Sequence, residues 1–362
     1  MAQLYGREWT KKELLRRIGS LGQVGGVRLF EYSDGASRGL RAAEIRTGSG
    51  LSFTILLDRG MDIGSVEFAG CPLNWESSVG FKHPAFFHHN GLDWLNTFGG
   101  GLVTTCGLSN VGVPNTDEGR DYGLHGCITA CPAENVRVEH NWNGGDMDIS
   151  VSGTMRETSV FGPNLCLERV IWTRLGEKKI FIEDKVTNES DENSPLMFLY
   201  HVNIGWPILD DETSIIIPTR KVTPRDAEAE KDKDNYDVFH SPQMGYKEKV
   251  FFHDMAADPA GYVPVAVVNP HIRSLCMGLY IKYLIKELPR FTQWKMLGEK
   301  TYVLGIEPGN CGVLGRADER KKGTLKILRP GESQTFHLEI GVISTPEELN
   351  QVSDQVNLLL KR

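Results

Sequence analysis

Apolar and polar residues alternate along most of this chain with a period of two positions. Such alternation places successive side chains on opposite faces of a β-strand. The clearest runs are Leu51–Leu57 and Arg59–Phe68. Further strands are expected near residues 135–140, 147–153, 165–175, 179–188, 195–203, 263–268, 274–281 and 301–306. Because many of the 39 glycines and 17 prolines punctuate these short segments, the pattern predicts an all-β fold, a large antiparallel β-sandwich.

A β-hairpin is expected near the C-terminus. Leu325-Lys-Ile-Leu is followed by the turn-forming residues Arg-Pro-Gly-Glu, and apolar residues then occupy every second position from Phe336 to Val342. Alternation on both sides of a turn is typical of two strands that pair with each other.

Two helices are expected, one at each end of the chain. Thr10 and Glu13 have the spacing of a capping box, and Gly19 would end this helix, so it is predicted over residues 10–19. Thr345-Pro-Glu-Glu348 has the same spacing with Pro at the first helical position, and apolar residues recur at helical spacing from Leu349 to Leu359.

Two segments depart from the strand pattern. Residues 76–123 are expected to be loop-rich, and loops of this length in a compact domain are usually functional or mobile. Residues 219–249 are charged and are expected to form a solvated insertion, with a lid over a cleft as the alternative. No segment is typical of a linker between domains, so residues 1–362 are expected to form a single domain.

Composition narrows the classes of partner. A net charge of −7 disfavours binding to a nucleic acid backbone, and no apolar run is long enough to predict a membrane span. The N-terminus lacks the pattern of a signal peptide. Seven cysteines, most among apolar or small neighbours, fit a reduced, cytoplasmic setting. Cys127 and Cys131 lack a second pair at zinc-site spacing, so neither a metal nor another cofactor is expected.

His201 and Glu307 are the candidate catalytic residues. His201 lies in the segment Phe198–Pro207 and Glu307 in the segment Tyr302–Asn310, and each is expected at the end of a strand, just before a turn. An imidazole and a carboxyl group fixed on rigid strands can act as a general acid and base without a cofactor. The alternatives are a hydrogen-bonded core histidine and a strand-end carboxylate that faces solvent.

Other residues are candidates for binding a substrate. His125 is followed by Gly126 and preceded two residues earlier by Gly123, and such glycines allow the backbone to approach a ligand closely. Arg59 could clamp hydroxyls or a carboxylate with its planar guanidinium. Trp294 could stack on a sugar face and Lys295 could bind hydroxyls. The alternatives are a loop histidine, a charge at a strand end, and an apolar strand with one exposed cation.

Several motifs together resemble the aldose 1-epimerase (galactose mutarotase-like) superfamily, and within it a branch of uncharacterised bacterial aldose-epimerase-like proteins. The resemblance covers nearly the whole chain and implies a large antiparallel β-sandwich. The motifs are Leu57-Asp-Arg-Gly-Met-Asp-Ile63, Phe98-Gly-Gly-Gly-Leu-Val-Thr-Thr-Cys-Gly-Leu108, Leu124-His-Gly126, His201-Val-Asn-Ile-Gly-Trp-Pro207 and Ile306-Glu-Pro308.

The resemblance implies roles for individual residues. Glu307 as a carboxylate would remove the proton of the anomeric hydroxyl, and His201 as an imidazolium would protonate the ring oxygen. His125 would contact the substrate. Asn203 matches the asparagine that follows the second histidine in the family, although here it comes only two residues later. Trp206 or Trp294 would form the floor of the pocket.

Two family features lack an obvious counterpart. The family arginine before the first histidine is missing from Phe98–Leu108, so Arg59 would replace it from a different strand. Asp210 and Asp211 are the candidates for the family aspartate that contacts sugar hydroxyls.

The expected function is therefore the interconversion of anomers of a monosaccharide or a derivative by acid/base ring opening. Two alternatives stay open: an isomerase or lyase that acts on a keto-sugar or sugar acid, and a non-catalytic carbohydrate-binding protein. The expected partner is a small-molecule carbohydrate, with neither nucleic acid nor membrane, and a homodimer stays open as the assembly state.

Overall fold

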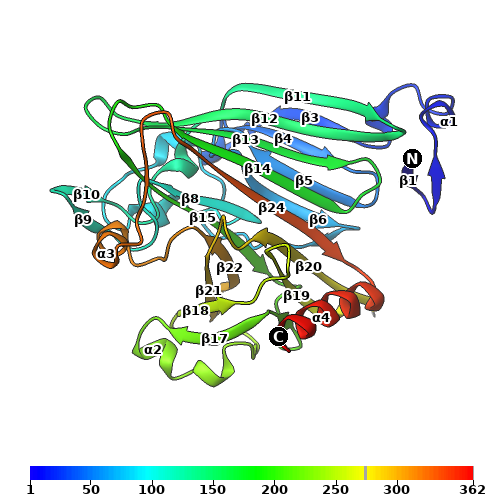
Figure 1. The fold of residues 1–362 in the computed structure, drawn as a ribbon. Coiled ribbons are helices and arrows are strands. Elements are labelled where there is room, and N and C mark those ends of the chain that lie inside the picture. The colour runs from blue at the N-terminus through cyan, green and yellow to red at the C-terminus, as the bar shows by residue number, and fades with distance from the viewer. Residues whose placement is uncertain (273–274, 362) are drawn as a thin grey trace.

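Two large antiparallel sheets form the body of the molecule, described here from a computed structural model for residues 1–272 and 275–361 (Figure 1). The eight-stranded sheet has the order β11-β12-β13-β14-β24-β20-β19-β16. Its strands are β11 (Glu134–Asn143), β12 (Asp146–Thr158), β13 (Asn164–Arg174), β14 (Lys179–Asn188), β24 (Ser333–Ile343), β20 (Leu275–Leu284), β19 (Tyr262–Ile272) and β16 (Ser214–Ile216). Residue 274, the first of the strand expected over 274–281, and residue 362 lie outside the described residues.

The twelve-stranded sheet has the main order β17-β18-β21-β22-β15-β8-β6-β5-β4-β3. β23 also pairs with β15, and β7 with β6. The strands are β17 (Thr219–Pro224), β18 (Lys249–Met255), β21 (Arg290–Gly298), β22 (Thr301–Gly309), β15 (Ser194–Gly205), β8 (Val103–Leu108), β6 (Asp62–Phe68), β5 (Leu51–Leu56), β4 (Arg41–Arg46), β3 (Gly26–Glu31), β23 (Lys326–Leu328) and β7 (Cys71–Pro72). The short strands β1 (Ala2–Leu4) and β2 (Arg7–Trp9) pair with each other, as do β9 (Asn115–Asp117) and β10 (Arg120–Tyr122).

The main core lies between the two sheets, which confirms the predicted all-β sandwich. Ile180 and Ile182 of β14 face it from the smaller sheet, and Tyr200 and Val202 of β15 face it from the larger one. All four side chains are buried, and their spacing of two positions is the alternation seen in the sequence.

Short helices surround the sheets. They are α1 (Lys11–Leu15), α2 (Ala227–Glu230), α3 (Arg316–Lys322) and α4 (Pro346–Leu360), with single 3₁₀ turns at η1 (Leu21–Gln23), η2 (Gly35–Ser37), η3 (Pro84–Phe86), η4 (Asp93–Thr97), η5 (Ile128–Ala130) and η6 (Lys233–Asn235). No helix of the described chain is long and apolar enough to cross a lipid bilayer.

Both predicted terminal helices are present. Thr10 and Glu13 form the expected capping box, but α1 ends at Leu15 rather than near Gly19, because the N–H of Arg17 bonds to the carbonyl of Leu14 in a tighter turn. At the C-terminus, the Thr345 side chain caps α4 as predicted.

The predicted C-terminal hairpin is wrong. β23 pairs with β15 of the larger sheet, whereas β24 pairs with β14 and β20 of the smaller one. Contacts at the end of β14 explain why β23 and β24 join different sheets. The backbone carbonyl of Asn188 accepts the N–H of Gly331, and its N–H donates to the carbonyl of Glu332. Its side-chain amide donates to the carbonyl of Leu328. The turn is therefore held by a third strand, and the chain crosses from one sheet to the other.

The segments 76–123 and 219–249 contribute more strand than expected. β8, inside the first segment, is a central strand whose residues are all buried, and such strands show no alternation. β17, at the start of the second, is an edge strand of the larger sheet. The interpretation of residues 219–249 as only a solvated insertion is therefore wrong.

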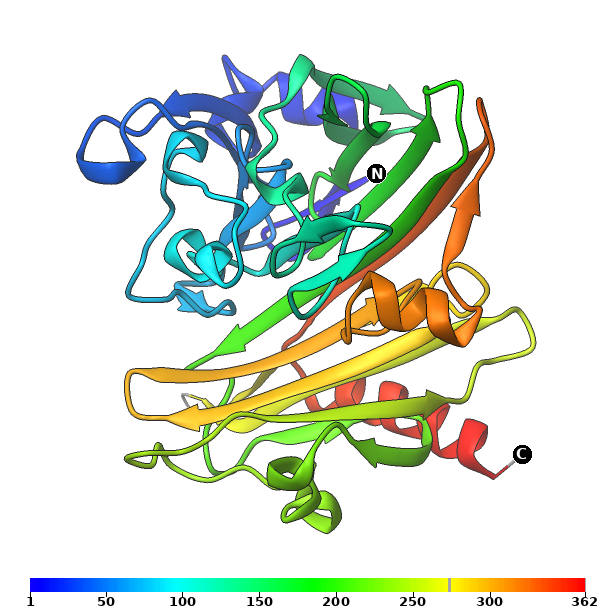
Figure 2. The same cartoon turned by 90° about the vertical axis from the view of Figure 1, so that its left-hand side faces the viewer.

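A second apolar cluster lies on the outer face of the larger sheet. It includes Leu199 of β15 and Val303 of β22, together with Trp94 and Phe98 from the loop-rich segment. Figure 2 shows this segment in cyan on the side of the molecule that faces the viewer, with α4 behind the strands. Side chains of β15 and β22 that point away from the main core therefore lie beneath these loops.

Candidate active site

His201 and Glu307 face each other on the outer face of the larger sheet. The register between β15 and β22 pairs Val202 with Ile306 and Asn203 with Gly305, which sets residue 201 opposite residue 307. His201 Nε2 lies 3.1 Å from Glu307 Oε1, and both side chains are buried. Both residues lie within their strands, so the expectation that each stands at a strand end before a turn is wrong.

Gly305 makes room for this pair. A Cβ atom at residue 305 would lie 2.6 Å from Glu307 Oε1 and 3.1 Å from the Cβ of Trp294. Both distances are closer than such atoms ordinarily approach. The absence of a side chain at Gly305 therefore allows the Glu307 carboxyl group to lie back over its own strand, toward His201.

The pair lines a cavity of about 380 Å³, a size typical of a small-molecule site. The strands of the larger sheet supply its base, and loops supply its walls. Its lining residues are Leu92, Trp94, Leu95, Phe98, Gly112, Val113, Pro114, Leu124, His125, His201, Arg225, Glu248, Val250, Thr292, Trp294, Glu307 and Val313. His125, His201, Trp294 and Glu307, which the sequence singled out far apart in the chain, thus meet in one cavity.

His125 reaches this cavity from a tight loop. Its backbone has the left-handed value φ = 56°, and Gly126 follows at φ = 70°, where a side chain would collide with the Gly107 carbonyl. His125 Nδ1 accepts the N–H of Gly112 at 3.3 Å. The ring hydrogen is therefore on Nε2, which makes that atom a donor.

Aromatic rings enclose the pair of catalytic candidates. The ring of His201 contacts those of Phe98 and Trp294, with centroids 5.4 Å away in each case, and the His125 ring at 5.8 Å. Trp94 lies 4.8 Å from the His125 ring. The surroundings of His201 and Glu307 are therefore largely apolar, which makes a charge on either group costly.

A polar network at the cavity rim was missed in the sequence. Glu248 accepts a hydrogen bond from Arg225 Nη2 and another from Trp294 Nε1, both at 2.9 Å. Arg225 and Glu248 come from the charged segment 219–249, where nothing in the composition distinguishes them from solvent-exposed charges. The structure alone shows that this segment, through β17 and the approach to β18, brings a cation and an anion to the cavity.

Burial shifts the pKa values of the two candidate catalytic groups in opposite directions. It raises the pKa of Glu307 to about 8, with a smaller contribution from the Glu248 charge. It lowers the pKa of His201 to about 4, which the Asn203 side chain partly opposes. The pKa of His125 falls to about 3 through burial and the neighbouring His201. At neutral pH these shifts favour a protonated Glu307 and a neutral His201.

Arg59 is not brought to the cavity. Its guanidinium is buried and donates to the carbonyls of Lys82 and Thr97, each at 2.9 Å, which fastens the loop-rich segment to the sheet. The neighbouring carboxylates are engaged as well: Asp58 binds Arg41, and Asp62 binds Thr129. In the described structure, these motif residues hold the fold together.

Two more predicted binding residues lie elsewhere. Lys295 is buried on the opposite face of β21 from Trp294, where it pairs with Asp232 at 2.9 Å. Trp206 is 66% exposed and lines a separate hollow beside β5 and β6. Neither residue can contact a ligand beside His201 in this arrangement.

Asn203 supports the site without lining the cavity. It is buried on the same face of β15 as His201, and its amide donates to the carbonyls of Gly101 and His201. Asp210 and Asp211, the candidates for the family aspartate, lie in the turn beyond β15 and do not line the cavity.

No metal site is evident in the part of the chain that the structure describes, where no three His, Cys, Asp or Glu side chains gather closely enough to hold an ion. Cys106, Cys127, Cys131, Cys166, Cys276 and Cys311 are free thiols. The ionisable side chains that line the cavity are those of His125, His201, Arg225, Glu248 and Glu307.

Solved structures with similar folds support the resemblance. A protein from Klebsiella pneumoniae subsp. pneumoniae MGH 78578, described as a "putative aldose 1-epimerase", is 27% identical, with a TM-score of 0.87 over 92% of this chain and 87% of that one. A galactose mutarotase-like protein from Clostridium acetobutylicum has a TM-score of 0.60 at 13% identity, over 89% of this chain and 100% of that one. Galactose 1-epimerase from Lactobacillus acidophilus NCFM has a TM-score of 0.56 at 12% identity, over 89% and 99%.

The sequence matches a family model as well, although no curated protein matches it. The fold and the first of these structures place the chain in the aldose 1-epimerase (galactose mutarotase-like) superfamily. Within it, the match to the family described as "Domain of unknown function (DUF4432)" spans residues 37–342, so the chain belongs to that family.

Proposed function

We propose that the protein is an isomerase of the aldose 1-epimerase type, which interconverts the anomers of a monosaccharide or a derivative. The single observation that carries the proposal is the 3.1 Å approach of His201 Nε2 to Glu307 Oε1 in a cavity of small-molecule size. Anomer exchange needs an acid at the ring oxygen and a base at the C1 hydroxyl. Because both oxygens are bonded to C1, the acid and the base must lie close together, as these two groups do.

In the proposed reaction, Glu307 as a carboxylate takes the proton of the C1 hydroxyl while His201 as an imidazolium protonates the ring oxygen. The bond between C1 and the ring oxygen breaks and C1 becomes a carbonyl carbon. Rotation about the C1–C2 bond exposes the other face of C1, the ring hydroxyl adds to it, and the two protons return. Each such acid or base typically contributes about 10²- to 10⁴-fold to the rate.

The resting pair already contains the one proton that this reaction needs. Before a substrate binds, that proton is on Glu307, because the pKa of Glu307 is about 8 and that of His201 about 4. A bound sugar would place hydroxyl donors beside the carboxyl group and so favour its ionised form. Transfer of the proton across 3.1 Å to His201 would then give the reactive carboxylate and imidazolium without exchange with solvent.

The remaining cavity residues suit a sugar ring. Nε2 of His125 is a donor that would stabilise the developing carbonyl oxygen. Trp294 offers an apolar ring, and Arg225 with Glu248 offers a donor and an acceptor at the rim for hydroxyl groups. A hydroxyl can accept from one and donate to the other.

The test is polarimetry of freshly dissolved reducing sugars, with and without the protein. The proposal expects a protein-dependent acceleration of the change in optical rotation, with no new product. An ultraviolet-absorbing product would identify a lyase, and deuterium incorporation at C2 in heavy water would identify a carbonyl isomerase. Binding of a sugar without any chemical change would identify a carbohydrate-binding protein, and each of these three results would contradict the proposal.

A further inference from the structure

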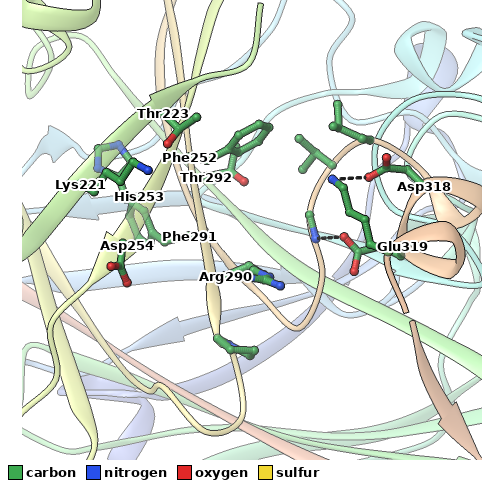
Figure 3. Close-up of a pocket in the computed structure, with 15 residues that line it drawn as sticks. Lys221, Thr223, Phe252, His253, Asp254, Arg290, Phe291, Thr292, Asp318 and Glu319 are labelled. Atoms are coloured by element: carbon green, nitrogen blue, oxygen red, sulfur yellow. Dashed lines mark hydrogen bonds and ion pairs between the residues drawn. The ribbon is translucent and has the colours of Figure 1, made fainter. Parts of the chain in front are cut away.

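A second cavity adjoins the candidate active site. It has a volume of about 470 Å³, larger than the first, and both cavities are lined by Thr292 and Val313 (Figure 3). Each volume falls within the range of roughly 300–1,000 Å³ that is typical of small-molecule sites. A single sugar ring held at His201 and Glu307 would leave the second cavity unfilled.

One row of side chains joins the two cavities across the larger sheet. Cross-strand pairing runs from Glu307 of β22 to Thr292 of β21, then to Phe252 of β18 and Thr223 of β17. Neighbours in such a row lie only about 5 Å apart. A ligand that follows this row would pass from the reacting carboxyl group into the second cavity without leaving the sheet.

Three charged side chains of the second cavity are available to bind a ligand. Lys221, Asp254 and Arg290 are exposed, and within the described residues their side chains make no hydrogen bond or ion pair. Lys221 and Asp254 are cross-strand partners on β17 and β18, and Arg290 begins the adjacent strand β21. Figure 3 shows all three, together with Phe252, among the residues that line this cavity.

The other charges of this cavity are already engaged. Asp318 pairs with Lys322 at 2.6 Å, and Glu319 accepts the N–H of Gly312 at 3.0 Å and the hydroxyl of Thr324. These interactions hold α3 and the chain before it against the cavity wall. The charged groups left for a ligand are therefore two cations and one anion, and the ring of Phe252 lies in the same cavity.

This combination favours a polyhydroxylated ring over an anion. A hydroxyl group both donates and accepts, so it can bind a lysine or arginine on one side and an aspartate on the other. The half-buried Phe252 ring offers an apolar surface for the C–H face of a sugar. A phosphate would meet the cations but would also lie near Asp254, Asp318 and Glu319, whose negative charges oppose it.

We propose that the substrate has a second sugar unit: the reducing-end ring would occupy the cavity of His201 and Glu307, and the next ring would occupy the cavity of Lys221, Asp254 and Arg290. The substrate class is then a reducing disaccharide or longer oligosaccharide. This inference rests on the proposed function for the identity of the first site, whereas the second site can be tested by binding alone.

The experiment compares lactose, maltose, cellobiose and melibiose with glucose, galactose and glucose 6-phosphate. Anomer exchange by NMR gives kcat/KM for each sugar, and calorimetry measures their binding to the Glu307→Gln protein. We expect at least one disaccharide to exceed its monosaccharides in kcat/KM and affinity. Arg290→Gln and Lys221→Gln each remove one hydrogen bond to a charged group. Each should therefore lower two ratios roughly tenfold: the disaccharide-to-monosaccharide ratio of kcat/KM and the same ratio of affinities.

Arg220→Gln is the matched control. Arg220 is an exposed residue of β17 that lines neither cavity, so its replacement should leave both ratios unchanged. Equal values for monosaccharides and disaccharides, a preference for glucose 6-phosphate, or ratios insensitive to Arg290 and Lys221 would each overturn the second subsite. Arg290-dependent disaccharide binding without anomer exchange would support the subsite and refute the proposed function.

Discussion

At the scale of single residues, the proposed activity depends on a carboxyl group and an imidazole that share one proton. Their ordinary pKa values, 4.5 and 6.5, are reversed in order by burial, to about 8 for Glu307 and about 4 for His201. The pair therefore keeps a single proton over a wide pH range. The apolar rings around it cause this shift and also keep competing water from the reacting atoms.

This reversal predicts a broad pH profile. Activity requires one proton on the pair, so kcat/KM should fall below about pH 4, where His201 gains a second proton, and above about pH 8, where Glu307 loses its proton. Because the two groups interact, the apparent pKa values obtained from this profile belong to the pair rather than to either residue. Ordinary pKa values would instead give a narrow optimum between about 4.5 and 6.5, so a decline that begins at pH 6.5 would contradict the account.

Four of the residues singled out in the sequence lie together in the structure. His201, Glu307 and His125 each stood beside apolar or glycine residues, whereas Trp294 stands between Gln293 and Lys295. In the structure all four line one cavity. Their roles remain predictions. Arg59 looked similar, but its donors go to backbone carbonyls that lie far away in the sequence. No local pattern reveals such a partner.

At the scale of elements, the strands β15 and β22 position the pair, and Gly305 allows its close approach. The alternation of apolar residues predicted these strands, and the long-range register set residue 201 against residue 307. The sequence could not show that β17 is an edge strand of the same sheet, because its residues are mostly polar and none of them is fully buried. Arg225 and Glu248 were missed for that reason.

Gly305→Ala tests this positioning. An added methyl group would lie 2.6 Å from Glu307 Oε1 and should push the carboxyl group away from His201, while the regular strand backbone accepts alanine. A displacement of about 1 Å can cost about 10²-fold in rate, so kcat should fall by about that factor with little change in the melting temperature. Gly298→Ala, on the neighbouring strand, has its closest contact with the flexible end of Met296 and serves as the control. Unchanged kcat in Gly305→Ala would count against the proposed geometry.

At the scale of the whole molecule, a buried ion-pair network ties the two sheets together. Arg169 of β13 binds Asp184 of β14 through two hydrogen bonds of 2.7 Å and also donates to Thr105 of β8. Tyr200 of β15 donates to Asp184 at 2.6 Å. Because Arg169 is fully buried, these contacts replace its hydration and fix the two sheets relative to each other.

Removal of this arginine should be strongly destabilising. Arg169→Met leaves Asp184 buried without its cation, and breaking a buried pair in this way costs about 3–5 kcal/mol in the free energy of unfolding. Arg174→Met on the same strand is the control, because Arg174 is partly exposed and pairs with Asp148 within the same sheet. Its loss should cost at most about 1 kcal/mol. Equal urea midpoints for the two variants would show that Arg169 does not hold the sheets together.

The sequence predicted the sandwich more reliably than it predicted the connections between its sheets. Alternation of apolar and polar residues predicts a strand with one buried face, and β12, β14 and β24 are strands of this kind. This pattern does not show which strands pair with each other, so the segment around Arg329 was expected to be a hairpin. The contacts of Asn188 with Gly331 and Leu328 decide that connection, and they join residues more than 100 positions apart.

The rate of anomer exchange tests whether Glu307 and His201 carry the proposed proton transfers, and it can be measured by NMR magnetisation transfer on the best sugar found by polarimetry. We expect Glu307→Gln and His201→Asn each to lower kcat by about 10²- to 10⁴-fold while the sugar still binds. Glu139→Gln and His140→Asn, on exposed positions of β11, should exchange anomers as fast as the wild type. Wild-type exchange rates in Glu307→Gln or His201→Asn would contradict the account.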